Sequence, residues 1–447
     1  MNRKFFWAFL VSSAVLAAAP SFTRDVRPIL QKRCAGCHQP ASKASDLDLT
    51  TFEALRKGGK LGPAFVAGKP DDSLVLRYIR GTEQPRMPLA QPELPAEEVT
   101  LIKDWIADGA KNDSTAEPTT RRTSVYLQPP VITALTFSPD GKQIAVSGNG
   151  EVLVHTSDGR TLVHRLPGQA ERILSLAYSK DGNLLVAGGG TPAQFGEVQV
   201  WDARAGKLLR SATLTNDTVF GASLAPDASK VAVGAADNTV HVLETATGKE
   251  LYKIGNHENW VLATVFGMDS KRFVSAGRDR AAKLIDANSG AFLENVNLLR
   301  GELAAVARHP KKDIVVLGGE ERYPYIYLMD RPRNMKIADD TTLVRKLERQ
   351  DGAITALDWS PDGSRIAVAS ASPNVNLYDV ETGDRKASCS GHSAGIYTVA
   401  FSPDGAQLAT GGFDGKVRIY NTKDCTLAHS FVPVPLSAGI AQAGGGQ

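Results

Sequence analysis

The chain has 447 residues, and its 51 Lys and Arg side chains nearly balance 48 Asp and Glu, which leaves a formal net charge of +3. This balance gives no indication of nucleic-acid binding, and we expect no nucleic-acid partner. A hydrophobic fraction of 42% is typical of a globular chain in water, and the length predicts two or three domains.

The first 21 residues have the features of an export signal. Arg3 and Lys4 precede an apolar run from Phe5 to Ala19, and small residues follow it. This run is shorter than the ~20 residues that a membrane-spanning helix needs. We predict a secretory signal peptide over residues 1–21, so that the mature protein is periplasmic or otherwise exported and has no membrane span. An uncleaved anchor is the alternative.

Residues 34–38 carry the most specific motif of the chain, Cys34-Ala35-Gly36-Cys37-His38. Two thiols at this spacing followed directly by an imidazole are what covalent attachment of a c-type haem requires. Cys34 and Cys37 are expected to form thioethers with the two vinyl groups, and His38 to bind the iron. A redox dithiol or half of a zinc site also uses the CxxC spacing, but the adjoining histidine favours one covalent haem c.

Met87 is the candidate for the second axial ligand of this haem. His38 is the only histidine before His155, and Met87 is the only methionine between the initiator and Met268. Ligation by His and Met raises the reduction potential relative to two nitrogen ligands, so a six-coordinate electron carrier is expected. The alternative is that Met87 fills a gap in the core.

The residues around the motif predict a small helical domain over residues 22–112. Helices are expected from Phe22 to Leu30 and from Pro95 to Ala110. The second helix has an apolar face, which carries Val99, Ile102, Trp105 and Ile106.

This domain resembles the Planctomycete-type cytochrome c, with an all-α fold similar to class I cytochromes c. The resemblance lies in Asp25-Val26-Arg27-Pro28-Ile29-Leu30, Cys34 to His38, Leu47-Asp48-Leu49, Gly58-Gly59, Gly62-Pro63, Gly68-Lys69-Pro70, Ser73-Leu74, Met87-Pro88 and Trp105 to Ala110. It implies that Cys34, Cys37 and His38 are the attachment and proximal positions, and that Met87 is the distal ligand. The family is a haem module found beside varied partners, so it implies a cofactor but no substrate.

A polar linker is predicted over residues 113–122, and beyond it the sequence repeats. Seven related turns follow one another at steps of 41, 46, 42, 42, 51 and 42 residues. They begin at Phe137, Tyr178, Leu224, Phe266, Arg308, Trp359 and Phe401. The fullest copies read Ser-Pro-Asp-Gly after an aromatic residue, with alternating apolar residues on both sides. Four strands in a period of about 40–45 residues predict a blade of a β-propeller.

These units resemble WD repeats, which implies an all-β, seven-bladed propeller over residues 123–433 and a flexible C-terminal tail over residues 434–447. Trp201-Asp202 closes one predicted third strand, and Gly391-His392 opens the last unit. Only one unit ends in Trp-Asp, so the blade boundaries are less well defined than the fold. Ser124 to Gln128 is a candidate for the strand that closes the ring.

The histidines of the propeller give no ligand set, because they form no HxH or HExxH pattern. WD repeats use an imidazole at the positions of His257 and His392 in a structural network with a turn aspartate, here Asp279 and Asp414. Four further histidines are expected to be ordinary polar residues of outer strands: His155, His164, His241 and His429. The turn aspartates are better explained by turn chemistry than by acid catalysis.

Two insertions interrupt the regular period, Gly188–Gly196 and Arg322–Asp351. The second contains Tyr323, Tyr325, Tyr327 and a basic cluster of Arg331, Arg333 and Lys336. Long loops on a rigid ring are frequent sites of partner contact, although solvated surface loops are the alternative.

Cys389 and Cys425 are the remaining cysteines, 36 residues apart against a repeat of 42. They therefore do not occupy equivalent positions in their units. A disulfide that joins the last two blades and a pair of separate thiols both stay open.

Three classes of function fit these patterns. The first is an exported electron carrier, in which the haem changes oxidation state and the propeller docks a redox partner protein. The second is a haem-based sensor or scaffold, in which displacement of Met87 changes what the propeller binds. The third is a haem enzyme that uses the propeller as a substrate or second-cofactor domain, for which the sequence shows no residue set.

Overall fold

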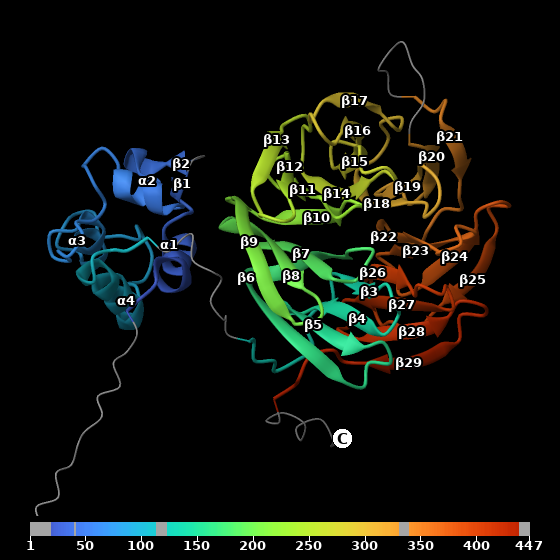
Figure 1. Ribbon diagram of the computed structural model, residues 1–447, viewed down its shortest axis with the longest axis horizontal. Coiled ribbons are helices and arrows are strands. Elements are labelled where there is room, and N and C mark those ends of the chain that lie inside the picture. The colour runs from blue at the N-terminus through green and yellow to red at the C-terminus, as the bar shows by residue number, and fades with distance from the viewer. Residues whose placement is uncertain (1–18, 40–41, 113–122, 330–338, 438–447) are drawn as a thin grey trace, which may run out of the picture. The chain divides into compact units, whose positions relative to one another are not determined.

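The computed structural model describes residues 19–39, 42–112, 123–329 and 339–437. Most of the predicted signal peptide and the whole predicted linker lie outside the described residues. The chain divides into two compact units, Met1–Ala116 and Glu117–Gln447, and each is described by itself (Figure 1).

The first unit is built mainly from short helices. Its elements are η1 (Phe22–Val26, a π-helix), α1 (Arg27–Arg33), β1 (His38–Gln39), β2 (Ser42–Lys43), η2 (Ala44–Asp46), α2 (Phe52–Lys57), α3 (Leu74–Arg80) and α4 (Ala96–Ala107). Both predicted helices are present, the first as η1 continued by α1 and the second as α4. The expected all-α fold needs one correction, because the chain reverses after His38 and its main-chain groups pair in a two-stranded antiparallel ladder, β1 with β2.

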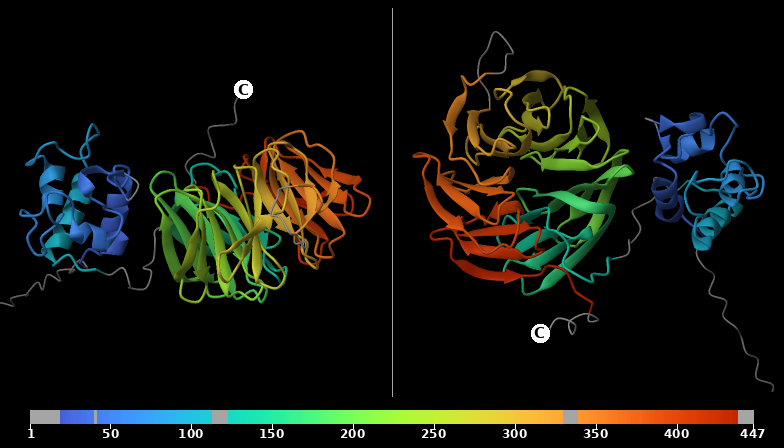
Figure 2. Two further views of the ribbon diagram at one scale, coloured as in Figure 1. Left: turned by 90° about the horizontal axis from the view of Figure 1, so that it is seen from above. Right: turned by 180° about the vertical axis from the view of Figure 1, so that it is seen from behind.

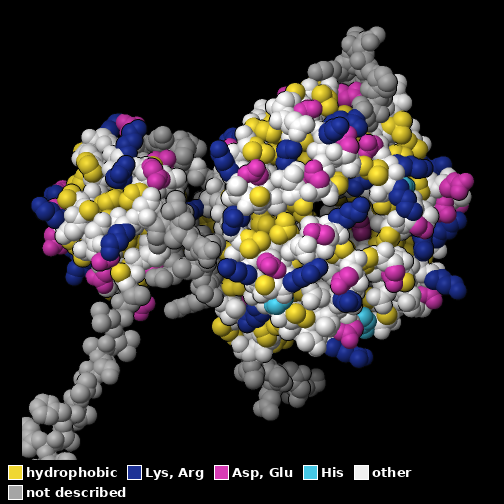
Figure 3. Space-filling view, viewed as in Figure 1, with side chains coloured by type: hydrophobic (Ala, Val, Ile, Leu, Met, Phe, Trp, Pro, Cys, Tyr) yellow, Lys and Arg dark blue, Asp and Glu magenta, His cyan; other side chains and the backbone are white. Residues whose placement is uncertain are grey.

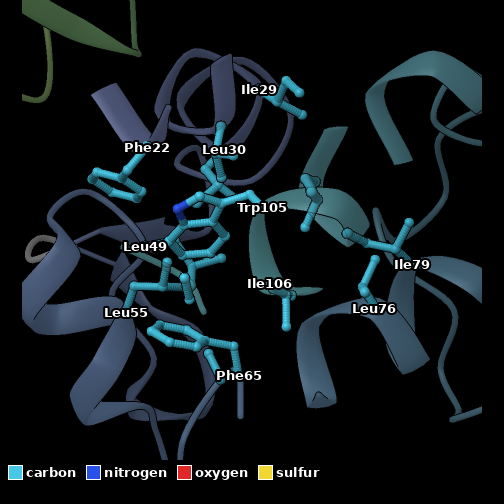
Figure 4. Packing of buried hydrophobic residues seen from close by; sticks show 14 of the residues in the cluster. Phe22, Ile29, Leu30, Leu49, Leu55, Phe65, Leu76, Ile79, Trp105 and Ile106 are labelled. Carbon is cyan, nitrogen blue, oxygen red and sulfur yellow. The ribbon is translucent and has the colours of Figure 1, made fainter. Parts of the chain in front are cut away.

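Trp105 of α4 forms the centre of the first unit's core (Figure 4). Its side chain is 1% exposed, and three aromatic rings surround it: Phe22, Phe52 and Phe65, with centroids 5.5, 6.2 and 5.1 Å away. Ile102 and Ile106 are also buried, so the predicted apolar face of this helix is confirmed. Leu30 of α1 belongs to the same cluster. Burial of this apolar surface holds α1 and α4 in one core.

The second unit consists of six sheets arranged as a ring (Figure 1). One has seven strands: β3 (Leu135–Phe137), β4 (Gln143–Ser147), β5 (Asn149–Thr156), β6 (Leu162–Tyr178), β7 (Leu184–Thr191), β8 (Phe195–Asp202) and β9 (Lys207–Thr215). The next two have four strands each: β10 (Val219–Leu224), β11 (Lys230–Ala235), β12 (Val240–Glu244) and β13 (Glu250–Ile254), then β14 (Val261–Phe266), β15 (Arg272–Gly277), β16 (Ala282–Asp286) and β17 (Phe292–Asn295).

The last three sheets also have four strands each. They are β18 (Leu303–Arg308), β19 (Ile314–Gly319), β20 (Tyr325–Leu328) and β21 (Leu343–Lys346), then β22 (Ile354–Trp359), β23 (Arg365–Ser370), β24 (Val375–Asp379) and β25 (Arg385–Cys389), then β26 (Ile396–Phe401), β27 (Gln407–Gly412), β28 (Val417–Asn421) and β29 (Leu427–Phe431). Strands within each sheet are antiparallel and follow chain order, with the first strand nearest the centre of the ring. Figure 2 shows the ring edge-on and from behind. The prediction of a β-propeller is confirmed.

The count of seven separate sheets is not confirmed, because β6 belongs to two neighbouring sets of strands. Its residues 162–167 and Arg172 pair with β5, and its residues 172–178 pair with β7. Between them, the backbone N–H groups of Gln169 and Ala170 donate to the buried carboxylate of Glu197 on β8. The chain therefore passes from one set of strands to the next without leaving the sheet.

The repeated Ser-Pro-Asp-Gly turns are stabilised by local hydrogen bonds. In the first copy, the Ser138 hydroxyl donates to Asp140 at 2.6 Å, and the Lys142 N–H donates to the same carboxylate at 3.1 Å. These bonds lower the pKa of Asp140 below its usual range. Gly141 has φ +70°, a conformation that favours glycine. The turn aspartates thus have the predicted structural role.

The insertion at Gly188–Gly196 is not a surface loop, and the expectation of a loop there was wrong. It extends β7 and β8 into a longer hairpin. A Cβ atom on Gly189 would lie 1.9 Å from the Arg172 carbonyl oxygen. The glycine run therefore permits close approach of two backbones, which explains its composition without a partner. In the other insertion, Arg331, Arg333 and Lys336 lie outside the described residues.

The ring closes where the first and last sheets meet. The Ile132 N–H donates to the Gly412 carbonyl at 3.0 Å, and an apolar cluster continues from β3 and β4 into β27 and β28. The segment proposed to add a closing strand forms only a single parallel bridge, between Tyr126 and Leu436. Val434 is 5% exposed, so the start of the predicted tail is packed against the propeller.

Cys389 and Cys425 form a disulfide, with a Cα–Cα distance of 4.7 Å. Cys389 ends β25, and Cys425 lies in the turn between β28 and β29. Of the two alternatives that the sequence left open, the bridge between neighbouring sheets is the one observed.

Candidate functional site

The end of α1 brings Cys34, Cys37 and His38 into one turn. The Cys34 N–H donates to the Leu30 carbonyl at 2.9 Å, which makes Cys34 the C-cap of the helix. The N–H groups of Cys37 and His38 then donate to the Cys34 carbonyl at 3.2 and 3.0 Å. Both thiols are free, with Cys37 exposed and Cys34 partly buried.

The imidazole of His38 is oriented by the backbone. The side chain is buried, and Nδ1 lies 3.1 Å from the carbonyl oxygen of Ala44 in η2. A carbonyl only accepts hydrogen bonds, so Nδ1 carries the hydrogen and Nε2 is the nitrogen with a free lone pair. A metal-binding histidine is commonly oriented by this arrangement, because the bond at one nitrogen fixes the tautomer and leaves the other to the metal.

The environment of Cys34 keeps its thiol protonated. Burial raises the pKa of Cys34 to about 12, and the negative charge of Glu98 acts in the same direction. A redox-active cysteine is expected to have a lowered pKa. The surroundings of Cys34 therefore do not match those of a redox dithiol.

An ion pair fixes the helix end that carries the motif. Arg33 donates from Nε and Nη2 to the two carboxylate oxygens of Glu98, each at 2.9 Å. Glu98 lies in the first turn of α4. The sequence did not indicate this pair, because the two residues are 65 positions apart and neither belongs to a motif.

Met87 lies on a separate segment between α3 and α4. Its side chain is partly buried, and its N–H donates to the Tyr78 carbonyl at 3.0 Å. Within the residues that the structure describes, no hydrogen bond joins Met87 to Cys34, Cys37 or His38. The structure thus brings three of the four predicted site residues together, while the fourth is held by α3.

In the part of the chain that the structure describes, no group of three or more His, Cys, Asp and Glu side chains is arranged to hold a metal ion. None of its helices is long and apolar enough to cross a bilayer.

The propeller histidines at the two WD positions have the predicted structural role. His257 bonds to Asp279 through Nδ1 at 2.9 Å and to the Ser275 hydroxyl through Nε2 at 2.7 Å. In the last sheet, His392 bonds to Asp414 at 3.1 Å and to Thr410 at 2.8 Å. Both imidazoles tie a loop to a strand.

Two of the other histidines differ from the expectation of ordinary outer-strand residues. His241 is 1% exposed and bonds to Glu250 at 2.7 Å and to Thr239 at 2.9 Å. His155 is 5% exposed and bonds to the Pro433 carbonyl at 2.8 Å. His155 lies on β5 and His241 on β12. Both are third strands in which consecutive residues are buried, so side chains on either face of the strand are covered.

Family models match both units of the chain. The model described as Planctomycete cytochrome C matches residues 34–90. The WD domain, G-beta repeat model matches residues 160–191 and 383–421, and the Anaphase-promoting complex subunit 4 WD40 domain model matches residues 306–399. The first match includes the Cys34–His38 turn and Met87.

Curated proteins with similar sequences are found in several organisms. "Transcription factor unc-37" of Caenorhabditis elegans is 31% identical over 44% of this chain and 31% of its own length. "Periodic tryptophan protein 2" of Arabidopsis thaliana is 23% identical over 60% of this chain and 29% of its own length. "Guanine nucleotide-binding protein subunit beta-5b" of Danio rerio is 22% identical over 57% of this chain and 74% of its own length. The chain spans about a third of the length of the first two relatives.

Proposed function

We propose that this chain, which joins a Planctomycete cytochrome c segment to a region of WD repeats, is an exported c-type cytochrome that carries electrons to or from a partner protein docked on its propeller. The observation that carries the proposal is the His38 ring, held by Ala44 through Nδ1 so that Nε2 is available to iron. It stands in the same turn as the two free thiols.

The residues of the turn fit a covalent haem. Cys34 and Cys37 would hold it by thioethers, and His38 and Met87 would be its axial ligands. The haem supplies a one-electron change between ferric and ferrous iron. A Cβ on Gly36 would meet no atom within 4 Å, so the chain between the two cysteines is open to a bulky group. The Arg33–Glu98 pair would keep the turn at a fixed place on the core.

The WD-repeat region supports a protein-docking role. We further propose that the region forms seven blades, a count supported by β6, which pairs with β5 through its first half and with β7 through its second half. Lys, Arg, Asp and Glu side chains are interspersed over the visible face of the propeller in Figure 3. A surface of mixed charge favours a protein partner over nucleic acid, which requires a basic surface.

Export is proposed from two features. One is the signal-like sequence at residues 1–21, and the other is the Cys389–Cys425 disulfide. Disulfides persist mainly in oxidising compartments, and covalent attachment of haem to CxxCH also takes place outside the bacterial cytoplasm.

Visible spectra of the oxidised and reduced protein, made with the periplasmic haem-maturation machinery, test the proposal. A low-spin c-type spectrum that does not change with carbon monoxide is expected, because both axial positions are filled. A five-coordinate spectrum that changes with carbon monoxide would favour the sensor function instead. A purified chain without covalent haem would contradict both.

A further inference from the structure

The segment that carries Met87 has few contacts of its own. No helix or strand occurs between the end of α3 at Arg80 and the start of α4 at Ala96. Leu89 is 63% exposed, and Leu94 is the only residue of this segment in the core cluster. A segment with so little buried apolar surface detaches from the core at a small cost in free energy. Contacts of another kind must therefore hold Met87 in place.

Arg86, the residue before Met87, provides such contacts. Its aliphatic stem lies on Gly81, where a Cβ atom would be 3.2 Å from Cδ. Gly81 is the C-cap of α3 and has φ +74°. At the other end, Nη2 donates to the Gln91 carbonyl at 3.3 Å, and Nη1 lies 3.5 Å from a carboxylate oxygen of Glu93. Arg86 thus spans from the helix cap to the far side of the segment.

We infer that Arg86 is a positioning residue for Met87 and controls how often small ligands reach the haem iron. The inference rests on the proposed function. With Arg86 in place, residues 86–93 form a closed loop that holds the Met87 sulfur near one position. Without the guanidinium, the contacts with Gln91 and Glu93 that close the loop are lost. The hydrogen bond from the Met87 N–H to the Tyr78 carbonyl remains. The loop would then open more often, and the Met87 sulfur would be away from its position for a larger fraction of the time, which would leave bound iron more open to small ligands.

The test is carbon monoxide binding to the ferrous full-length protein with Arg86→Gln. We expect carbon monoxide affinity to rise about three- to tenfold, because one hydrogen bond and one partly exposed ion pair are lost. Arg80→Gln is the matched control, since Arg80 ends α3 and pairs with Asp71 at 2.7 Å, and its side chain is 32% exposed against 33% for Arg86. Covalent haem content and the melting temperature show that each variant is loaded and folded.

Two further variants separate the possible explanations. Arg86→Lys keeps the positive charge but lacks the planar fork, so it should also raise the affinity if closure of the loop matters, and should match the wild type if only the charge matters. The second result would overturn the inference. Met87→Ala should raise the affinity more than Arg86→Gln. If Met87→Ala opens the iron and Arg86→Gln does not, the role of Arg86 is wrong; if neither does, Met87 is not the ligand and the proposed axial ligation is wrong.

Discussion

Arg33 and Glu98, 65 residues apart in the chain, are joined by two parallel hydrogen bonds of 2.9 Å. Arg33 ends α1 and Glu98 lies in the first turn of α4, so the pair links the end of α1 that precedes Cys34 to the start of α4. The side chains are 30% and 22% exposed. A bidentate ion pair at this exposure stabilises the fold more than an ordinary surface ion pair does, because both charges have a fixed geometry and limited access to water.

We expect Glu98→Gln to weaken the packing of α1 on α4 by about 1–2 kcal/mol, since it leaves Arg33 without its carboxylate. Hydrogen exchange of the backbone amides in the two helices measures this change. Glu97→Gln is the control, because Glu97 is exposed in the same first turn and shares the favourable helix-dipole interaction. Equal effects of the two substitutions would show that the Arg33 pair contributes nothing.

The two thiols of the turn are expected to hold one haem together. Cys34→Ser and Cys37→Ser should each retain at most one thioether, and the double variant should retain none, because the serine hydroxyl does not add to a vinyl group. Mass spectrometry of the denatured chain measures the covalent haem. The control is Cys389→Ser with Cys425→Ser in the propeller, which should load haem as the wild type does. Full attachment in a Cys34 or Cys37 variant would remove that cysteine from the site.

The period of the repeats was enough to predict the propeller. A turn motif that recurs every 41 to 51 residues predicts four strands in each unit, and five of the six sheets have four strands. The continuity of β6 was not predictable, because it depends on the Glu197 carboxylate accepting from Gln169 and Ala170 across the sheet. The need for glycine at position 189 was not predictable either, because it arises from the Arg172 carbonyl of the neighbouring strand β6.

The first unit shows a similar division between local and long-range information. The Cys34–His38 motif and the apolar face of α4 are local patterns, so the sequence predicted them. The partner of the His38 Nδ1 atom is a backbone carbonyl, that of Ala44, and backbone carbonyls carry no sequence signature. Glu98 and Arg86 act through contacts formed only after the helices pack, and no spacing rule identifies them.

The Cys389–Cys425 bridge is expected to stabilise the propeller by about 3–4 kcal/mol, because it closes a 36-residue separation in the unfolded chain. Urea unfolding of Cys425→Ala should show this loss. Cys389→Ala with Cys425→Ala should cost no more than the single change, since one bond is removed in both. An unfolding midpoint of the wild type that does not move when a reductant is added would mean that the bridge does not stabilise the fold.

Asp358 on β22 gives a pH-dependent prediction. Its carboxylate accepts from the Trp359 N–H at 2.9 Å and, across to the next sheet, from the Phe401 N–H at 2.8 Å. Burial raises the pKa of Asp358 to about 7. The unfolded chain releases this proton near pH 4, whereas the folded chain keeps it up to about pH 7. The contribution of this group to the free energy of unfolding therefore falls as pH rises through that window, and is constant above it.

Asp358→Asn removes this titration, so its stability relative to the wild type should rise by roughly 3–4 kcal/mol between pH 4 and pH 7. Urea unfolding at several pH values measures the difference. Asp362→Asn in the adjoining turn should behave oppositely, because the Ser360 hydroxyl lowers the pKa of Asp362 to about 2. Its carboxylate stabilises the fold above pH 4, and this stabilisation is lost as pH falls towards 2. If the Asp358→Asn difference does not change with pH, Asp358 is ionised in the folded protein throughout that range.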